Sequence, residues 1–363
     1  MRLHLPLLAT TCVAALLLAA PAQAGQAITS QTVMTVTNPA GHSTTSIVII
    51  GSTVTGAVTN AGTIAPGKAG INNTTVALAI LNSSVGGGVN NSGTITVSGA
   101  HQAFAVLIGS QISGGLVNSG TIDVNAGHTA VGISANTTII GGVANSGTIT
   151  ANGNGLAFGL AVTTVIGDVT NSGTITASGG GANSAGAVGI QVISSSGAVA
   201  NGGEITVNAA QNGGAQGIFV ASRADSISNS GRVTVSTASG PGNGTGISLL
   251  AFGSVANGIV NSGTITVSSA NNNARGIHVS AATVAGGISN IGTITATGSG
   301  AKGFVDGISI GQNTTITGGI TNGGTINGTG VNFTRGIESD NSTTSGGIEN
   351  SGSITLSGKT GLG

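Results

Sequence analysis

The sequence predicts an all-β fold, a parallel β-helix (β-solenoid) of about eleven three-strand coils, each about 29 residues long. Three observations predict it. One short block recurs along the chain, its residues alternate between apolar and polar with a period of two, and glycine is abundant while charged residues are scarce. No helical period of 3.6 residues is present after residue 24.

The recurring block reads Asn-x-Gly-Thr-Ile, and its clearest copies are residues 91–97 and 261–267. Within the first copy, Ile95 and Val97 alternate with threonines, so the apolar side chains can point inward and the threonines outward. Ten intervals between eleven copies span 290 residues and average 29. The asparagines of these copies are Asn60, Asn91, Asn118, Asn145, Asn171, Asn201, Asn229, Asn261, Asn290, Asn322 and Asn350.

Two further blocks complete each coil. An Ala-x-Gly-Ile block, such as residues 130–133, lies between consecutive asparagines, and a Gly-Gly-Val block, such as residues 141–143, precedes each asparagine. Three strands per coil follow, separated by glycine and asparagine. We expect Gly93 and its equivalents to turn a corner with positive φ, and each asparagine amide to bond the asparagine one coil away, ~4.8 Å along the rod.

The composition excludes several classes of protein. Of 363 residues, 67 are glycine, only 4 % are charged, and tryptophan and tyrosine are absent. A nucleic-acid-binding protein needs a basic patch, and an ordinary enzyme domain builds its site from charged and aromatic groups. Disorder is excluded as well, because 39 % of the residues are hydrophobic and the net charge is zero.

The N-terminus has the three parts of a secretory signal peptide. Met1-Arg2 is followed by an apolar stretch, residues 5–20, and by the small residues Ala22-Gln23-Ala24. We expect cleavage after Ala24. A transmembrane anchor is the alternative, but polar residues interrupt the apolar stretch. Cleavage would remove the only cysteine, Cys12. Residues 25–55 are predicted to form an N-terminal cap and residues 56–363 the solenoid.

Aligning the copies predicts which charged residues are neighbours. Glu204 and Arg232 occupy one position in adjacent coils and should form an exposed ion pair. Arg275, Asp306 and Arg335 share a position in three successive coils, and we expect their side chains in solvent. Earlier coils carry apolar residues in that row, which either form an outward apolar stripe or, as we favour, rotate inward at the glycine corner. They are Leu78, Phe104, Val131, Phe158 and Val188.

A cleavable signal, a passenger without cysteine and Gly-Gly-Val-x-Asn-Ser-Gly-Thr-Ile-Thr coils resemble the passenger region of bacterial autotransporters of the type V secretion pathway, across residues 25–363. The resemblance implies a Gram-negative envelope, a surface-exposed right-handed β-helix, and export through a C-terminal outer-membrane barrel. No barrel strands follow Asn350, and the sequence ends one strand into a coil. We therefore expect a fragment, a truncated product, or a passenger whose barrel partner lies elsewhere.

Few residues suggest site chemistry. Gly298-x-Gly300-x-x-Gly303 spells a dinucleotide fingerprint and residues 352–360 approximate a P-loop, but neither has the strand-then-helix context. Among the acids, only Asp306, Glu338 and Asp340, beside Arg335, could cluster, and we interpret them as a solvated charge patch. His42, His101, His128 and His278 lie in different coils without ligand spacing. We predict no catalytic, cofactor-binding or metal-binding residue, and no cofactor.

The prediction for function is an exported, non-catalytic stalk or adhesive surface, located at the cell surface, on the outer membrane or outside the cell. Its expected partners are a translocator barrel and a host or neighbouring-cell surface or polysaccharide, not nucleic acid. One alternative is a carbohydrate-active β-helix enzyme or polysaccharide-binding protein, which needs Asp306, Glu338 and Asp340 to line one groove. A remote alternative is an ice-binding solenoid built on Thr-x-Thr pairs, which are Thr94/Thr96, Thr148/Thr150, Thr174/Thr176, Thr264/Thr266 and Thr293/Thr295.

Overall fold

Alternation of apolar and polar residues makes each repeat a set of β-strands that bury one face. In the computed structural model, the described residues are 25–67, 74–180, 186–211, 213–238, 242–250, 252–300 and 303–362. They form β-strands joined by short turns, and they include no helix long and apolar enough to cross a membrane. The predicted signal peptide, residues 1–24, lies outside the described residues.

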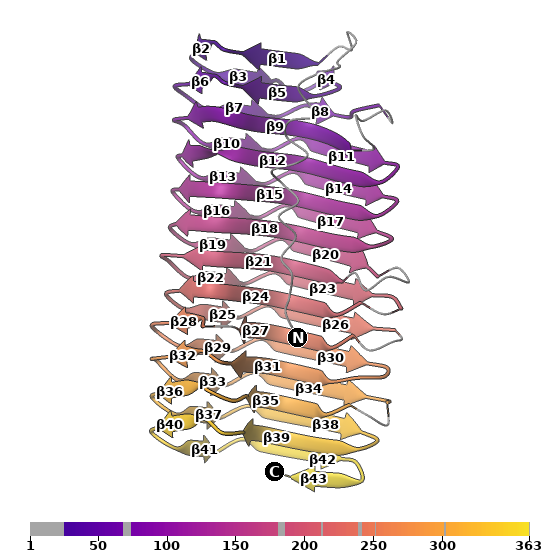
Figure 1. The fold of residues 1–363 in the computed structure, drawn as a ribbon, viewed down its shortest axis with the longest axis vertical. Helices are drawn as coiled ribbons and strands as arrows, with labels where there is room; N and C mark the ends of the chain where they lie inside the picture. The colour runs from indigo at the N-terminus through magenta and orange to yellow at the C-terminus, as the bar shows by residue number, and fades with distance from the viewer. Residues whose placement is uncertain are drawn as a thin grey trace.

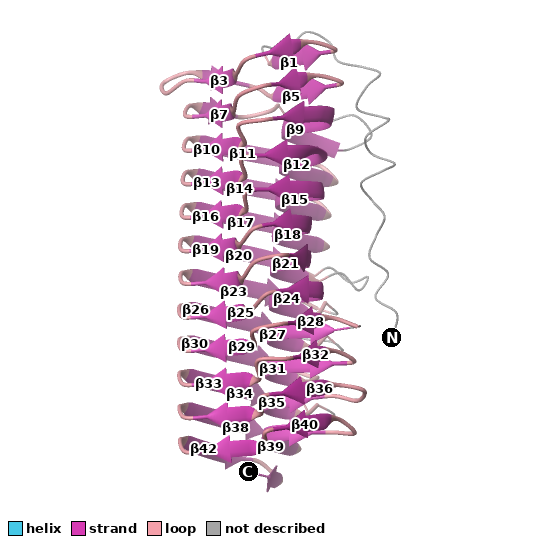
Figure 2. Ribbon diagram, turned by 90° about the vertical axis from the view of Figure 1, so that its left-hand side faces the viewer, coloured by secondary structure: helices cyan, strands magenta, loops and turns pink. Residues whose placement is uncertain are grey.

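The strands stack into three parallel sheets that run the length of a rod (Figures 1 and 2). Each coil contributes one strand to a sheet of short strands (sheet B), then one to a sheet of six-residue strands (sheet C), then one long or two short strands to sheet A. The fold-class prediction of an all-β parallel solenoid is confirmed. In the described residues, sheets B and C have 12 strands each and sheet A has 19.

The strands of sheet B are β3 (Val36–Asn38), β7 (Val58–Asn60), β10 (Val89–Asn91), β13 (Leu116–Asn118), β16 (Val143–Asn145), β19 (Val169–Asn171), β22 (Val199–Asn201), β25 (Ile227–Asn229), β29 (Ile259–Asn261), β33 (Ile288–Asn290), β37 (Ile320–Asn322) and β41 (Ile348–Asn350). Those of sheet C are β4 (Ser43–Thr44), β8 (Thr63–Ile64), β11 (Thr94–Gly99), β14 (Thr121–Ala126), β17 (Thr148–Gly153), β20 (Thr174–Gly179), β23 (Glu204–Ala209), β26 (Arg232–Thr237), β30 (Thr264–Ser269), β34 (Thr293–Gly298), β38 (Thr325–Gly330) and β42 (Ser353–Ser357).

Sheet A begins with single and paired strands near the N-terminus: β1 (Gln26–Thr29), β2 (Thr32–Val33), β5 (Ile47–Ile50), β6 (Thr53–Val54), β9 (Thr74–Val85), β12 (Gln102–Ser113), β15 (Thr129–Ile140), β18 (Leu156–Ile166), β21 (Ala187–Ser195) and β24 (Ala215–Ala224). Its later strands are β27 (Gly244–Leu250), β28 (Ser254–Val255), β31 (Ala274–Ser280), β32 (Thr283–Val284), β35 (Val305–Ile310), β36 (Thr315–Thr317), β39 (Phe333–Ser339), β40 (Thr343–Ser345) and β43 (Thr360–Leu362).

The core is a stack of aliphatic side chains enclosed by the three sheets. Ile95 on β11 pairs in register with Ile122, which pairs with Ile149, and all three side chains are fully buried. Equivalent residues continue this row along sheet C. Each fully buried isoleucine or valine contributes about 1.5–3 kcal/mol relative to exposure, so the repeated pattern supplies the main driving force for coiling.

A ladder of asparagine side chains joins the coils where sheet B turns into sheet C. In the middle of the rod, Asn145 Nδ2 donates to Asn171 Oδ1 at 2.7 Å, and Asn171 Nδ2 donates to Asn201 Oδ1 at 2.7 Å. The predicted bond between asparagines one coil apart is therefore confirmed. The ladder extends from Asn38 to Asn350, so it begins within residues 25–55, the predicted cap, one asparagine before the predicted repeats.

Residues 25–55 pair in register with the coils that follow them. Strand β1 pairs with β5, and β3 pairs with β7, with Asn38 opposite Asn60. The interval between these asparagines is only 22 residues. The capping role of residues 25–55 stays a prediction, but their strands belong to the same three sheets as the rest of the rod.

The glycine of each Asn-x-Gly block is needed for close approach, not for positive φ. Gly93 and its equivalents do not have positive φ, so that prediction is wrong; positive values occur instead in the Gly-Gly pairs, as at Gly141 and Gly142. A Cβ at Gly203 would overlap the carbonyl oxygen of Gly173 and lie 2.6 Å from the carbonyl carbon of Ser172. Each such glycine therefore lets one coil rest on the backbone of the coil before it.

Two adjacent glycines test this explanation. We expect Gly203→Ala to lower the free energy of unfolding by at least about 2 kcal/mol, because the added methyl group has to displace a neighbouring backbone. Gly202→Ala should change it by less than about 0.5 kcal/mol, because a Cβ there lies 3.5 Å from its nearest neighbour, Ser230 Oγ. Urea unfolding followed by circular dichroism measures both. Equal losses in the two variants would contradict the close-approach explanation.

Candidate functional site

The outer face of sheet A collects charged side chains near the C-terminal end of the rod. Arg275 on β31 pairs in register with Asp306 on β35, which pairs with Arg335 on β39. Because strand residues alternate between the two faces and the neighbouring positions are in the core, these three side chains lie on the outside of the sheet. The predicted neighbourhood of the three charges is confirmed.

The sequence predicts that the Asp306 side chain lies in solvent, and this prediction is wrong: the side chain is fully buried, with 0 % of it exposed. Arg335 holds its carboxylate through two bonds, Nε to Oδ1 at 2.7 Å and Nη2 to Oδ2 at 3.1 Å. Arg275 Nε donates to Oδ2 at 3.3 Å from the other side. A buried carboxylate is tolerated only when it is paired and hydrogen-bonded, and two guanidinium groups satisfy that requirement here.

The remaining groups around Arg335 fix its orientation. Its guanidinium carbon lies 4.5 Å from the centre of the Phe304 ring, and its Nη1 donates to Glu338 Oε1. Ser309 Oγ donates to the other oxygen of Glu338 at 3.2 Å. Burial, followed by the nearby Asp306 charge, raises the pKa of the Glu338 carboxyl, while Arg335 opposes that shift.

His278 lies in the next row of the same face. It pairs in register with Ser309, and its Nδ1 contacts the Ser309 carbonyl oxygen at 3.3 Å. A carbonyl only accepts, so Nδ1 carries the proton in this contact and Nε2 keeps its lone pair. The pKa of His278 is lowered to about 4, mainly by burial and then by the Arg275 charge, while the hydrogen bond to Ser309 opposes the shift. The imidazole is therefore neutral at pH 7.

These residues border a shallow hollow of about 430 Å³ on the outer face of sheet A. Two of the three acids that the enzymatic alternative requires, Glu338 and Asp340, line this hollow, but Asp306 does not. The interpretation as a solvated patch is thus wrong for Asp306 and holds for exposed Asp340. Arg275 and Arg335, which the sequence placed in the same row, line the hollow as well. The lining also includes side chains that the sequence did not bring to this site, which are His278, Ser280, Phe304, Ser309 and Gln312.

Toward the N-terminus, the same row becomes apolar. Phe104 pairs with Val131 and with Val76, not with Leu78, which pairs with Val106 in the core. The row therefore contains Val76, and its assignment to Leu78 is wrong. Phe104 packs against a cluster that is separate from the main core, so the favoured inward rotation is also wrong. That outer cluster comprises Val76, Ala79, Leu81 and Leu107.

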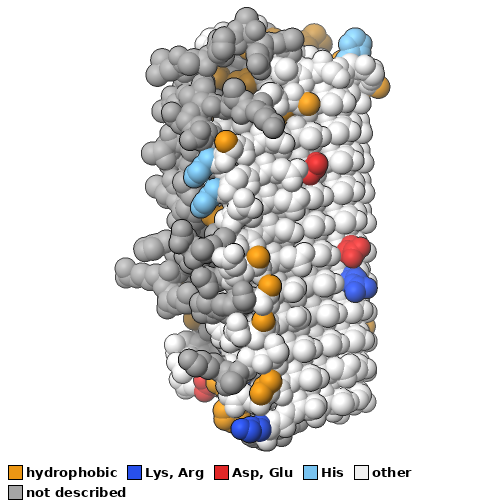
Figure 3. All heavy atoms as spheres, turned by 90° about the vertical axis from the view of Figure 1, so that its right-hand side faces the viewer, with side chains coloured by type: hydrophobic (Ala, Val, Ile, Leu, Met, Phe, Trp, Pro, Cys, Tyr) orange, Lys and Arg blue, Asp and Glu red, His pale blue; other side chains and the backbone are white. Residues whose placement is uncertain are grey.

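Charges elsewhere are scattered. Figure 3 shows one face of the rod on which charged side chains are few. Glu204 and Arg232 are in register and exposed, as predicted, but they form no ion pair within the described part of the chain, because Arg232 Nε donates to Thr234 Oγ1 at 3.1 Å. His101 and His128, in adjacent coils, stack with ring centres 4.9 Å apart. Across the described ranges, no three His, Cys, Asp or Glu residues converge as metal ligands.

Threonine and asparagine rows mark the outer face of sheet C. Thr94 pairs with Thr121 and Thr264 with Thr293, so the Thr-x-Thr rows align as predicted. Charged or amide residues interrupt them, for example where Glu204 pairs with Thr174 and where Asn327 pairs with Thr295. The rows are therefore regular hydroxyl surfaces only over parts of the rod.

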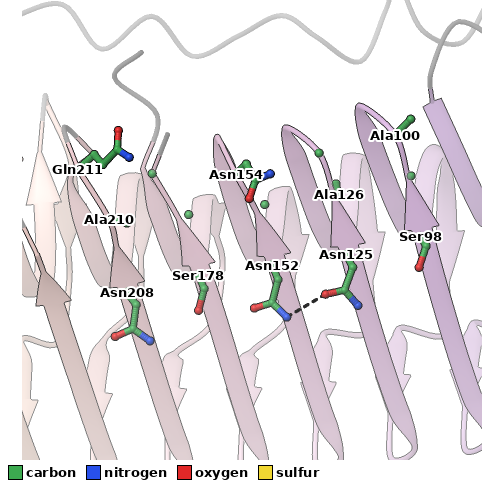
Figure 4. Close-up of a pocket in the computed structure, with 15 residues that line it drawn as sticks. Ser98, Ala100, Asn125, Ala126, Asn152, Asn154, Ser178, Asn208, Ala210 and Gln211 are labelled. Atoms are coloured by element: carbon green, nitrogen blue, oxygen red, sulfur yellow. Dashed lines mark hydrogen bonds between the residues drawn. The ribbon is translucent and has the colours of Figure 1, made fainter. Parts of the chain in front are cut away.

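A groove of about 940 Å³, lined by Ser, Asn, Gln, Gly and Ala residues, runs beside these rows, at the edge of sheet C. Figure 4 shows Ser98, Asn125, Asn152, Ser178 and Asn208 projecting side by side from five successive strands. Asn152 Nδ2 donates to Asn125 Oδ1 at 3.1 Å. Among the described residues that line it, none is charged or aromatic, so these residues offer hydrogen bonds and no titratable group.

Sequence reasoning missed Phe304, Ser309 and the role of His278. The alignment of the repeats could have predicted that His278 and Ser309 are neighbours, since they follow Arg275 and Asp306 by three residues in consecutive coils. Burial of Asp306 had no comparable signal, because it depends on side chains from three coils meeting. No protein-family model, no curated protein and no solved structure matches the chain.

The lowered pKa of His278 makes stability depend on pH. Between pH about 4 and 6.5 the unfolded imidazole binds a proton that the folded one does not, so the free energy of unfolding falls as the pH falls through this window. Between pH 7 and pH 4, the free energy of unfolding of the parent protein should fall by about 3 kcal/mol more than that of the His278→Gln variant. Urea unfolding at each pH measures both values.

Glu338 makes the free energy of unfolding rise as the pH falls, because its pKa is higher in the folded state, which therefore binds a proton more readily than the unfolded state. This contribution is present in both the parent protein and His278→Gln, so the comparison between them isolates the imidazole. Parallel pH profiles for the two proteins would show that His278 is not buried in its neutral form.

Proposed function

We propose that the chain is an exported, non-catalytic structural protein that serves as a stalk or adhesive surface. The observation that carries the proposal is the unbroken asparagine ladder from Asn38 to Asn350, which joins successive coils of the three sheets into one long rod. A rod of this kind presents the same polar rows many times over, so adhesion can rest on area and repetition. The signal-peptide pattern of residues 1–24 supports export.

The resemblance to autotransporter passengers supports a place for this rod at the surface of a Gram-negative cell. Its partners would be an outer-membrane translocator barrel and a host or neighbouring-cell surface or polysaccharide. The nearly uncharged outer faces agree with a surface that does not select its partners by long-range electrostatics.

The enzymatic alternative has weaker support. A glycosidase needs two carboxyl groups that can act on either side of the scissile bond. Asp306 is buried and bound to two arginines, and both oxygens of Glu338 accept hydrogen bonds from Arg335 and Ser309. Asp340 alone remains as an exposed carboxylate in the hollow. The hollow therefore lacks the free pair that hydrolysis requires.

Expression of the full chain in a Gram-negative bacterium tests the proposal. We expect N-terminal sequencing to place Gly25 first in a product outside the inner membrane. Leu17→Arg, which puts a charge in the apolar stretch, should keep the chain uncleaved in the cytoplasm, while Thr11→Ser should not.

Beads coated with the exported protein should clump or attach to cells.

Each part of the proposal has its own contrary result. A parent chain that stays in the cytoplasm with Met1 intact would contradict export. Beads that behave like uncoated beads would contradict the adhesive role, whatever the route of export.

A further inference from the structure

Charged residues cluster at the hollow on β31, β35 and β39, whereas they are scattered along the rest of the rod. Arg275, Asp306, Arg335, Glu338 and Asp340 come from three successive coils, in a chain with only 8 basic and 8 acidic residues. A buried carboxylate, a neutral histidine and a carboxyl of raised pKa in one concave place are features of binding sites more than of a solvated surface.

Counting hydrogen bonds shows which groups are already used. Each of the three side-chain nitrogens of Arg335 donates a hydrogen bond to Asp306 or Glu338, and both carboxylate oxygens of Glu338 accept one. Asp306 accepts from two arginines. These three residues hold one another in place, so they position the floor of the hollow.

Other lining groups are left open. Arg275 uses only Nε, and its two terminal nitrogens have no hydrogen-bond partner among the described residues. His278 keeps the lone pair of Nε2, and the exposed Asp340 carboxylate and the Gln312 amide border the same space. One coil away, Ser248 pairs in register with His278, and its buried Oγ has no partner in the described structure.

This mixture matches the chemistry of a sugar. A hydroxyl group both donates and accepts, so it suits guanidinium donors beside imidazole and carboxylate acceptors. The carboxylates of Glu338 and Asp340 would repel a simple anion, and the guanidinium groups of Arg275 and Arg335 would repel a simple cation.

Aromatic residues add an apolar surface for the carbon faces of a sugar ring. Phe304 lines the hollow, and Phe333, which is 41 % exposed, packs beside it with ring centres 5.8 Å apart. The volume of about 430 Å³ lies within the range of small-ligand sites.

We propose that this hollow binds neutral sugar units of a polysaccharide, through hydrogen bonds from Arg275 and to His278 and Asp340, with Phe304 and Phe333 at its apolar side. Asp306 is a positioning residue, because it holds both arginines from beneath. The sugar is bound and not cleaved. This site deepens the proposed function, on whose polysaccharide partner it rests, but sugar binding can be measured without export or bead attachment.

Titration of the full chain with maltohexaose, cellohexaose and mannohexaose, each followed by calorimetry, tests the proposal. We expect at least one of them to bind with a dissociation constant near 1 mM or tighter. Asp340→Ala should weaken that binding at least tenfold, and Arg275→Lys should also weaken it, because lysine keeps the charge but has one nitrogen where arginine has a fork. Glu349→Ala removes an exposed carboxylate outside the hollow and should bind as the parent does.

Circular dichroism confirms that each variant is folded before titration. The proposal is overturned if none of the three sugars binds with a dissociation constant of about 1 mM or tighter, or if Asp340→Ala binds as tightly as Glu349→Ala. Neither result would affect export or bead attachment, so failure of this site and failure of the proposed function are distinguishable.

Discussion

The asparagine ladder is the interaction on which the rest of the structure depends. Each ladder asparagine inside the rod is buried, and its amide donates to the next asparagine toward the C-terminus, as Asn145 does to Asn171 and Asn171 to Asn201. Its backbone carbonyl also accepts two N–H groups of the next coil, as Asn171 does from Gly202 and Gly203. All donors point the same way, so successive bonds can polarise one another. Only a side chain with both a donor and an acceptor can continue such a row.

The ladder also fixes what its neighbours have to be. Once the asparagines stack directly, the glycine two residues later rests on the backbone of the preceding coil and has no room for a side chain. The isoleucine that follows is then placed in the core, and the threonines around it point outward. The high glycine content and the low charge of the chain are consequences of this repeated contact, because stacked backbones and amides replace charged surface.

The period and the register of sheets B and C could be predicted from the sequence, because Asn, Gly and Ile recur there at fixed spacing. Asn38 was missed because its coil spans only 22 residues to Asn60, although Val-Thr-Asn at 36–38 matches 58–60. Leu78 was misplaced because sheet A absorbs the variation in coil length. The site depends on Phe304, Arg275 and Arg335 covering Asp306, and the spacing of one repeat carries no information on how deep that side chain lies.

The most direct test of the ladder is to remove one member from its middle. Asn171→Ala leaves Asn145 Nδ2 without its acceptor on the next coil and Asn201 Oδ1 without its donor. Equilibrium urea unfolding of the full chain should show a loss of about 3 kcal/mol, since each buried polar group left unpaired costs about 1–3 kcal/mol. In the control variant, Ser172→Ala at the neighbouring exposed position, the free energy of unfolding should fall by less than about 0.5 kcal/mol. If Asn171→Ala unfolds at the same urea concentration as Ser172→Ala, the ladder is not what holds the coils together.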